Sequence, residues 1–259
     1  MKPETDSPAF RAWESGPGRP PYPATGQVHV WRVCLSSFRL SAALWRRILS
    51  PEENDRADRF HFDRDRETWL ITRGILRTLL GCYLDLPASN LELTANASGK
   101  PALHSRFLSR DFRFNVSHSG QCSLLAFASG IDIGVDVECH QARCHVEELA
   151  TSVLSPDDLA VFQRLPLHLR PAAFFAAWTR KEAVLKACGV GLSLSPELIE
   201  VTFAPNEDPA LRRGPDLLAP FDRWSLRSLD VAEHYSAAVA APAAEINLSL
   251  WNFPEFEAC

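Results

Sequence analysis

The chain has 259 residues, 46% of them hydrophobic and 23% charged, a balance that excludes a wholly disordered, collagen-like or coiled-coil protein. Its 27 Lys and Arg against 32 Asp and Glu give a formal net charge of −5, which argues against a general binder of duplex DNA or of anionic membranes. No apolar run approaches the roughly 20 residues of a membrane span, and the N-terminus lacks the apolar stretch of a secretory signal. We therefore expect a cytoplasmic protein.

The first half of the chain is predicted to place helices before strands. Residues 1–26 are rich in Pro and Gly and are expected to form a disordered or extended tail. A strand begins near Val28, a helix is predicted to start at Ser50 and Pro51, and apolar residues recur at helical spacing over residues 64–84. Short strands are then expected at residues 91–94, 112–116, 122–128 and 131–138.

The second half repeats this order. Residues 204–220, rich in Pro and acidic residues, are expected to form a surface loop. Two halves of similar size, residues 27–130 and 131–259, indicate an internal pseudo-repeat in an α+β architecture. The predicted helices of the second half lie near residues 155–163 and 172–188, and its predicted strands near residues 198–203, 224–229, 235–240 and 246–251.

The seven cysteines are scattered along the chain, and their odd number does not suit a disulfide framework. We interpret them as reduced thiols that mostly pack in the core. One cluster combines thiols with imidazoles, but a structural zinc site usually takes its second pair of ligands from a distant segment. We therefore expect no zinc at this cluster, which consists of Cys139, His140, Cys144 and His145.

Two carboxylates share one face of the strand predicted at residues 131–138. Alternation places Asp136 and Glu138 opposite the apolar residues, with about 6.5–7 Å between their Cα atoms. Such a pair can hold Mg²⁺, which prefers one or two carboxylates together with waters and phosphate oxygens. The alternative is the solvent-facing side of a half-exposed strand.

A third carboxylate interrupts the apolar side of the helix predicted at residues 172–188. Glu182 lies on the helical stripe that also carries Phe175 and Trp178. Burial of an unpaired carboxylate is costly, so this position favours a cation, metal or proton partner. Lys186, four residues further on, is one such partner, and the alternative is an ordinary surface Glu/Lys pair.

Two polar segments complete the candidate site. Gly99, Lys100 and Pro101 form a predicted turn in which glycine permits close backbone approach and lysine offers a positive charge. Residues 114–120 end a strand in small polar donors suited to a phosphate group, namely Asn115, Ser117 and His118. Taken alone, either segment could also be a plain turn.

Together these segments resemble the 4'-phosphopantetheinyl transferase superfamily, in the Sfp-like branch where one chain contains both pseudo-symmetric halves. Four motifs in order carry the resemblance, which is far more specific than any one of them. They are Gly-Lys-Pro at residues 99–101, Phe-Asn-Val-Ser-His at 114–118, Gly-Val-Asp-Val-Glu at 134–138 and Trp-Thr-Arg-Lys-Glu-Ala-Val-Leu-Lys at 178–186.

The resemblance implies transfer of the 4'-phosphopantetheine arm of coenzyme A to a serine of an acyl or peptidyl carrier protein, with release of adenosine 3',5'-bisphosphate. It implies that Glu182, directly or through a metal-bound water, takes the serine proton and that Lys186 neutralises or protonates the leaving phosphate. The implied ligands of Mg²⁺, with Mn²⁺ as the alternative ion, are Asp136, Glu138 and Glu182. The implied coenzyme A contacts are Arg56, Arg73, Gly99, Lys100, Pro101, Asn115, Ser117, His118, Lys181 and Lys186.

The implied fold is a pair of helix-plus-antiparallel-sheet halves, with the metal site in the second half. We expect a monomer that binds neither nucleic acid nor membrane and meets its carrier through Arg143, Arg164 and Arg170. Two other functions stay open. One is a Mg²⁺-dependent hydrolase that cleaves a nucleotide pyrophosphate with water in place of serine, and the other is a non-catalytic module that binds coenzyme A or the carrier.

Overall fold

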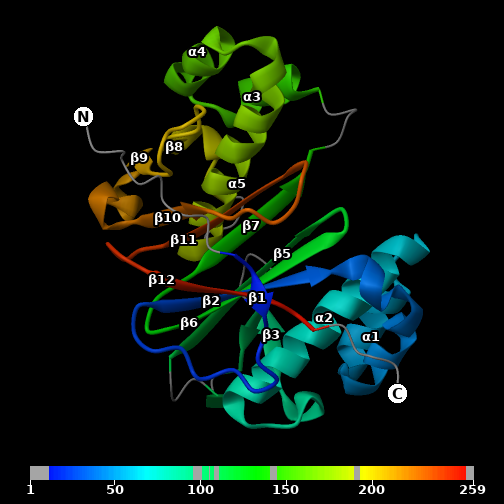
Figure 1. Cartoon of the computed structure of the whole chain (residues 1–259). Helices are drawn as coiled ribbons and strands as arrows, with labels where there is room; N and C mark the ends of the chain where they lie inside the picture. Colours follow the sequence, from blue (N-terminus) through cyan, green and yellow to red (C-terminus); the bar gives the residue numbers. More distant parts are fainter. Residues whose placement is uncertain are drawn as a thin grey trace.

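The computed structural model describes residues 12–95, 101–104, 106–107, 111–140, 145–189 and 193–254. Two β-sheets meet in the middle of the molecule, with helices α1 (Pro51–Asp58) and α2 (Asp63–Leu84) on one side. Helices α3 (Val146–Val153), α4 (Pro156–Arg164) and α5 (Arg170–Cys188) lie on the other side (Figure 1). The fold is therefore α+β with a helical layer outside each sheet.

The first sheet has five strands, and its core is antiparallel. Strand β2 (Gln27–Cys34) pairs with β6 (Cys122–Ser129), which pairs with β5 (Phe112–Ser119). On the other edge β12 (Asn247–Asn252) runs parallel to β2, and β1 (Glu14–Ser15) runs parallel to β12. The last strand of the chain thus lies in the sheet of the first half, so a boundary at residue 130 does not separate the two sheets.

The second sheet has three antiparallel strands in the order β10 (Ser225–Ser228), β11 (Tyr235–Ala241) and β7 (Gly134–Cys139). Helix α5 packs against β7 and β11. Two small ribbons are formed by β3 (Leu93–Ala95) with β4 (Pro101–Leu103) and by β8 (Glu200–Val201) with β9 (Leu211–Arg213). The 3₁₀ segments are η1 (Leu35–Ile48), η2 (Ala88–Asn90), η4 (Leu167–Leu169), η6 (Pro196–Leu198), η7 (Asp216–Leu218) and η8 (Phe221–Arg223).

Strand alternation explains how the layers pack. In β6 the side chains of Leu124 and Ala126 join a core shared with the second sheet, while Leu125 and Phe127 join the core beneath α2. In β7 the apolar face also enters the shared core, as the sequence predicts. The opposite face of β7, which carries Asp136, is therefore turned toward α5.

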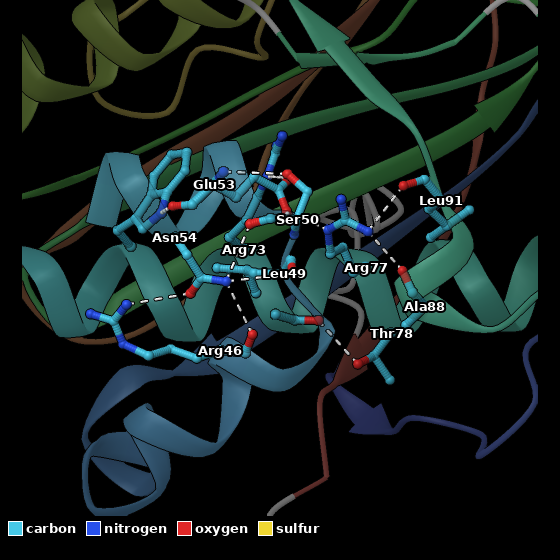
Figure 2. Close-up of polar contacts among 12 residues, drawn as sticks. Arg46, Leu49, Ser50, Glu53, Asn54, Arg73, Arg77, Thr78, Ala88 and Leu91 are labelled. Carbon is cyan, nitrogen blue, oxygen red and sulfur yellow. Dashed lines mark hydrogen bonds and ion pairs between the residues drawn. The ribbon is translucent and has the colours of Figure 1, made fainter. Parts of the chain in front are cut away.

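An ion cluster fixes the helical layer of the first half (Figure 2). Ser50 and Glu53 form a capping box at the start of α1, where proline occupies an early position. The Glu53 carboxylate also accepts hydrogen bonds from Arg73 Nε and Arg77 Nε of α2, both at 2.6 Å. Arg77 continues to the carbonyl oxygen of Ala88 at 2.8 Å. One buried carboxylate therefore ties α1, α2 and η2 together.

Three segments that differ from the expectation contribute buried side chains to the core. The sequence pattern predicts neither the 14-residue η1 nor α3. Residues 204–220, expected to be a surface loop, contain β9 and η7, and they bury Leu211 and Leu218 beneath the second half. Isolated apolar residues among prolines give no periodic signal, so burial here depends on distant contacts. No helix in the ranges described combines the length and apolarity that a bilayer span requires.

Candidate active site

The two sheets are joined along β5 and β7 by side chains. Alternate residues of β5 share one face, and three of them each bond to β7. The pairs are Asn115 Oδ1 with Val135 N (2.8 Å), Ser117 Oγ with Asp136 Oδ1 (2.7 Å) and Ser119 Oγ with Glu138 Oε2 (2.8 Å). This row of contacts, which we call the β5–β7 seam, forms the floor of the candidate site.

Helix α5 covers the seam closely because Gly134 has no side chain. A Cβ atom at this position would lie 1.9 Å from the carbonyl oxygen of Ala183 in α5. The close approach brings the polar side of α5 over β7 and leaves a cavity of about 380 Å³ between them. The cavity is lined by Val116, Ser117, His118, Asp136, Glu138, Trp178, Glu182 and Lys186.

Lys186 and Asp136 form the central ion pair. The ammonium nitrogen of Lys186 lies 2.6 Å from Asp136 Oδ1 and 3.0 Å from Ser117 Oγ. Asp136 is only 3% exposed, and its second oxygen, Oδ2, is buried and has no hydrogen-bond partner among the described residues. A buried oxygen that lacks a donor is costly, so the site has one coordination position ready for a cation or a donor group.

The two glutamates add negative charge to the same cavity. Glu138 is held by Ser119 and by Trp178 Nε1, which donates to Oε1 at 3.3 Å. Burial raises the pKa of Glu138, and the nearby Asp136 acts in the same direction. Burial and then Asp136 likewise raise the pKa of Glu182. Three carboxylates facing one ammonium leave an excess of negative charge that a cation would relieve.

The donor set fits a hard divalent cation whose shell is completed by other oxygens. Within the described ranges, no three His, Cys, Asp or Glu side chains converge closely enough to form a ready metal centre. Mg²⁺ does not need a centre with three protein ligands, because it binds through one or two carboxylates plus waters and substrate phosphates. The unpartnered Asp136 Oδ2 and the raised pKa values of Glu138 and Glu182 are the features that favour such an ion.

Comparison with known proteins identifies the family. Residues 30–130 match the model described as 4'-phosphopantetheinyl transferase, N-terminal, and residues 132–240 match that of the 4'-phosphopantetheinyl transferase superfamily. The chain belongs to this superfamily. It is of the single-chain type, because the two matches together cover both halves.

Two curated transferases align with most of this chain. The chain is 33% identical to the 4'-phosphopantetheinyl transferase HetI of Nostoc over 88% of this chain and 92% of that protein. It is 25% identical to the L-aminoadipate-semialdehyde dehydrogenase-phosphopantetheinyl transferase of Mus musculus over 81% of this chain and 73% of that protein. A Thermotoga maritima holo-[acyl-carrier-protein] synthase structure is 22% identical, with a TM-score of 0.36 over 45% of this chain and 65% of its own.

The structure brings together part of the set predicted for this transferase. All three predicted metal ligands line the cavity, as do Ser117, His118 and Lys186. His118 is exposed at the rim, and the surrounding protein and then the Lys186 ammonium lower its pKa. Arg56 is exposed on α1, where its guanidinium lies 4.3 Å from the Trp69 ring centroid.

The structure places three residues predicted to contact coenzyme A in contacts within the protein. Lys181 is 0% exposed, and its ammonium bonds to the carbonyl oxygen of Val153 at 3.0 Å. It also lies 3.2 Å from Asp158, because it leaves α5 about 100° away from Glu182. Asn115 is 3% exposed in the seam, and Arg73 is bound to Glu53. A motif position alone does not tell which side of an element a residue faces.

Other predicted residues are not placed by the structure. Gly99 and Lys100 lie outside the described residues, whereas Pro101 begins β4. Cys144 of the Cys/His cluster also lies outside them, so the prediction that this cluster binds no zinc stays a prediction.

Neither Ser119 nor Trp178 was predicted as a site residue, although the spacing of each in the sequence indicates one. Ser119 lies two residues beyond Ser117 on the same face of a strand, and Trp178 lies one helical turn before Glu182. Their common role is to hold the Glu138 carboxylate from opposite sides.

Proposed function

We propose that this protein transfers the 4'-phosphopantetheine arm of coenzyme A to a serine hydroxyl of an acyl or peptidyl carrier protein and releases adenosine 3',5'-bisphosphate. The observation that carries the proposal is the cavity in which Asp136, Glu138 and Glu182 surround the Lys186 ammonium. Similarity to HetI over nearly the whole chain supports the same reaction.

The side chains divide the chemistry among them. Glu182 accepts the proton of the attacking serine, and its raised pKa brings it nearer to the pH at which a general base is most effective. Lys186 donates to Asp136 in the free protein and lies at the same cavity wall, where it can pair with the departing phosphate. His118 at the rim and Arg56 on α1 supply contacts for the 3'-phosphate.

The proposed metal is Mg²⁺, with Mn²⁺ as the alternative ion. Asp136, Glu138 and Glu182 would hold it, and Asp136 Oδ2 is the oxygen that has no hydrogen-bond partner within the part of the chain that the structure describes. When bound, the ion supplies charge neutralisation on the pyrophosphate of coenzyme A.

We further propose that the protein is closer to the HetI and aminoadipate-semialdehyde dehydrogenase transferases than to holo-[acyl-carrier-protein] synthases. Both halves of this chain align with those relatives. Because the two halves are already joined in one chain, we propose a monomeric, cytoplasmic enzyme.

Mass spectrometry of an apo carrier protein tests the proposal. With coenzyme A and Mg²⁺, the carrier should gain the mass of one phosphopantetheine group, and a carrier whose target serine is changed to alanine should gain none. A pyrophosphate hydrolase would consume coenzyme A and leave the carrier unchanged, and a binding module would change neither. Either of these outcomes would overturn the transferase.

A further inference from the structure

Two cysteines face each other on neighbouring strands of the first sheet, away from the cavity described above. Strands β2 and β6 lie side by side in the first sheet (Figure 1). In this antiparallel pair, Cys34 is the register partner of Cys122. The backbone N–H of Leu35 donates to the carbonyl oxygen of Gln121 at 2.8 Å. This bond flanks the cysteine pair, which identifies the pair as one of the non-hydrogen-bonded positions of the ladder.

That position has the spacing of a disulfide. Directly opposite residues at non-hydrogen-bonded positions have Cα atoms about 4.5 Å apart and side chains on the same face. Disulfides join residues whose Cα atoms are about 4.4–6.8 Å apart. Cys34 and Cys122 can therefore be bridged by side-chain rotation without moving the strands, although both are free thiols in the structure.

Both thiols also open onto one cavity of about 600 Å³, which is separate from the carboxylate site. Cys34 is exposed, whereas Cys122 is 6% exposed beneath it. A small oxidant can thus reach the first thiol directly, and the second thiol lies behind it at the start of β6.

The two thiols differ in reactivity. A hydrogen bond between Cys34 and the Ser36 hydroxyl, with sulfur and oxygen 3.1 Å apart, lowers the pKa of the Cys34 thiol. Burial raises the pKa of Cys122 to about 12. Because the thiolate is the nucleophile in disulfide exchange, Cys34 attacks first and Cys122 follows.

We propose that Cys34 and Cys122 are a redox modification site that closes into a reversible cross-strand disulfide when a low-molecular-weight disulfide such as oxidised glutathione is present. The Cys34 thiolate attacks one sulfur of glutathione disulfide, which breaks that S–S bond and releases one glutathione thiolate. Cys122 then loses its proton and attacks the Cys34 sulfur, releasing the second glutathione. The protein is oxidised by two electrons, and one glutathione disulfide is reduced to two thiols.

The test uses the full-length reduced protein, incubated with oxidised glutathione, blocked with N-ethylmaleimide and digested with trypsin without reduction. We expect residues 33–39 to be linked to residues 114–143, and dithiothreitol should separate the two peptides. The second peptide contains Cys122 and Cys139 together. The link should therefore persist in Cys139→Ser and disappear in Cys122→Ser.

Three results would overturn the proposal: glutathione that stays on Cys34 while Cys122 is still alkylated, a link that uses Cys139, or both thiols alkylated as in the untreated protein. If Cys122→Ser does not fold, fragmentation of the linked wild-type peptide assigns the sulfur, because Cys122 and Cys139 are separated by many backbone bonds. The readout is peptide mass, so the result does not depend on the proposed transferase activity.

Discussion

Glu182 lies in a cavity with two other carboxylates and one lysine, and it is the residue that we propose as the general base. We expect Glu182→Gln to fold and to lower kcat by about 100-fold or more, which is the usual contribution of a general base. Carrier modification at saturating coenzyme A and Mg²⁺ measures this loss. Glu148→Gln, which changes an exposed glutamate on α3, is the matched control and should keep wild-type turnover. Full activity of folded Glu182→Gln would remove Glu182 from the proposed site.

The same substitution makes a prediction about stability that needs no activity. Because burial and Asp136 raise the pKa of Glu182 above 4.5, the folded protein holds this proton more tightly than the unfolded chain does. The stabilisation that the protonated Glu182 carboxyl contributes is fully present below pH about 4.5. It is lost as the pH rises through the higher pKa that this carboxyl has in the folded protein. In metal-free buffer at pH 7.5, Glu182→Gln should therefore melt at a higher temperature than wild type.

Two comparisons check the sign of this effect. The difference in Tm between Glu182→Gln and wild type should shrink as the pH approaches 4.5. Adding Mg²⁺ should raise the Tm of wild type more than that of the variant, because a ligand stabilises the state that binds it. Equal Mg²⁺ shifts in the two proteins would contradict the placement of Glu182 beside the ion.

His118 and Lys100 test the recognition of coenzyme A. If these two side chains contact the 3'-phosphate, His118→Ala and Lys100→Ala should weaken the binding of coenzyme A more than the binding of 3'-dephospho-coenzyme A. A charge-assisted contact contributes roughly 1.5–3 kcal/mol, which corresponds to about 10-fold or more in KM. Steady-state KM values for both substrates measure the difference. Equal losses on the two substrates would place these side chains elsewhere on the ligand.

At the scale of elements, the site depends on how closely α5 approaches β7. We expect Gly134→Ala to destabilise the protein by about 1–3 kcal/mol or more, because its Cβ would clash with the backbone of α5 at Ala183. Urea unfolding of the full chain measures this change. The control is Gly18→Ala, since a Cβ at Gly18 meets nothing within 4 Å. Comparable stability of the two variants would contradict the tight packing of α5 on β7.

Helix α5 is also held from its far side by a buried lysine. Lys181 pairs with Asp158 of α4, and both side chains are 0% exposed. Removing one member of a buried pair leaves the other charge without its partner, so Lys181→Met should lower the free energy of unfolding by about 3–5 kcal/mol. Arg212, which lies 3.3 Å from Asp158, should offset part of this loss. The double variant Lys181→Met with Asp158→Leu should regain stability in urea unfolding. A double variant no more stable than Lys181→Met would contradict this role for the pair.

Periodicity in the sequence predicted the strands and helices in which one apolar face packs against the core. Alternation placed Asp136 and Glu138 on one face of β7, and helical spacing defined α2 and α5. The β5–β7 seam could not be predicted, because it joins two sheets through side chains rather than through a backbone ladder. Lys181 was predicted to contact coenzyme A from its place in the motif, whereas its side chain is 0% exposed beside Asp158. Its partner Asp158 belongs to a different helix, which only the tertiary structure reveals.

At the scale of the whole molecule, the two halves are interlocked rather than merely adjacent. Strand β12, near the end of the described chain, pairs with β2 at the start of the first half, and β1 adds to its other side. Valine and alanine side chains from both sheets fill one shared core. The cavity therefore lies where the two sheets join, with its floor from β5 and β7 and its cover from α5.

The charge of the whole molecule leads to a prediction about carrier docking. The net charge is −5, and carrier proteins of this kind typically present an acidic helix beside their serine, so overall attraction cannot drive the encounter. Of the three arginines proposed to meet the carrier, Arg164 is exposed, Arg170 is already bonded to Glu147, and Arg143 lies outside the described residues. Arg164 is therefore the exposed member of this set in the part of the chain that the structure describes.

Exposed ion pairs contribute about 0.2–1 kcal/mol each and are screened by salt. We expect the KM for the carrier to rise less than about fivefold between low and physiological ionic strength, with kcat nearly unchanged and Mg²⁺ held constant. Arg164→Ala should reduce this salt dependence further, whereas Arg19→Ala, which removes an exposed cation paired with Asp85 beyond α2, should not. A steep salt dependence like that of a nucleic-acid binder would instead require a concentrated basic docking face.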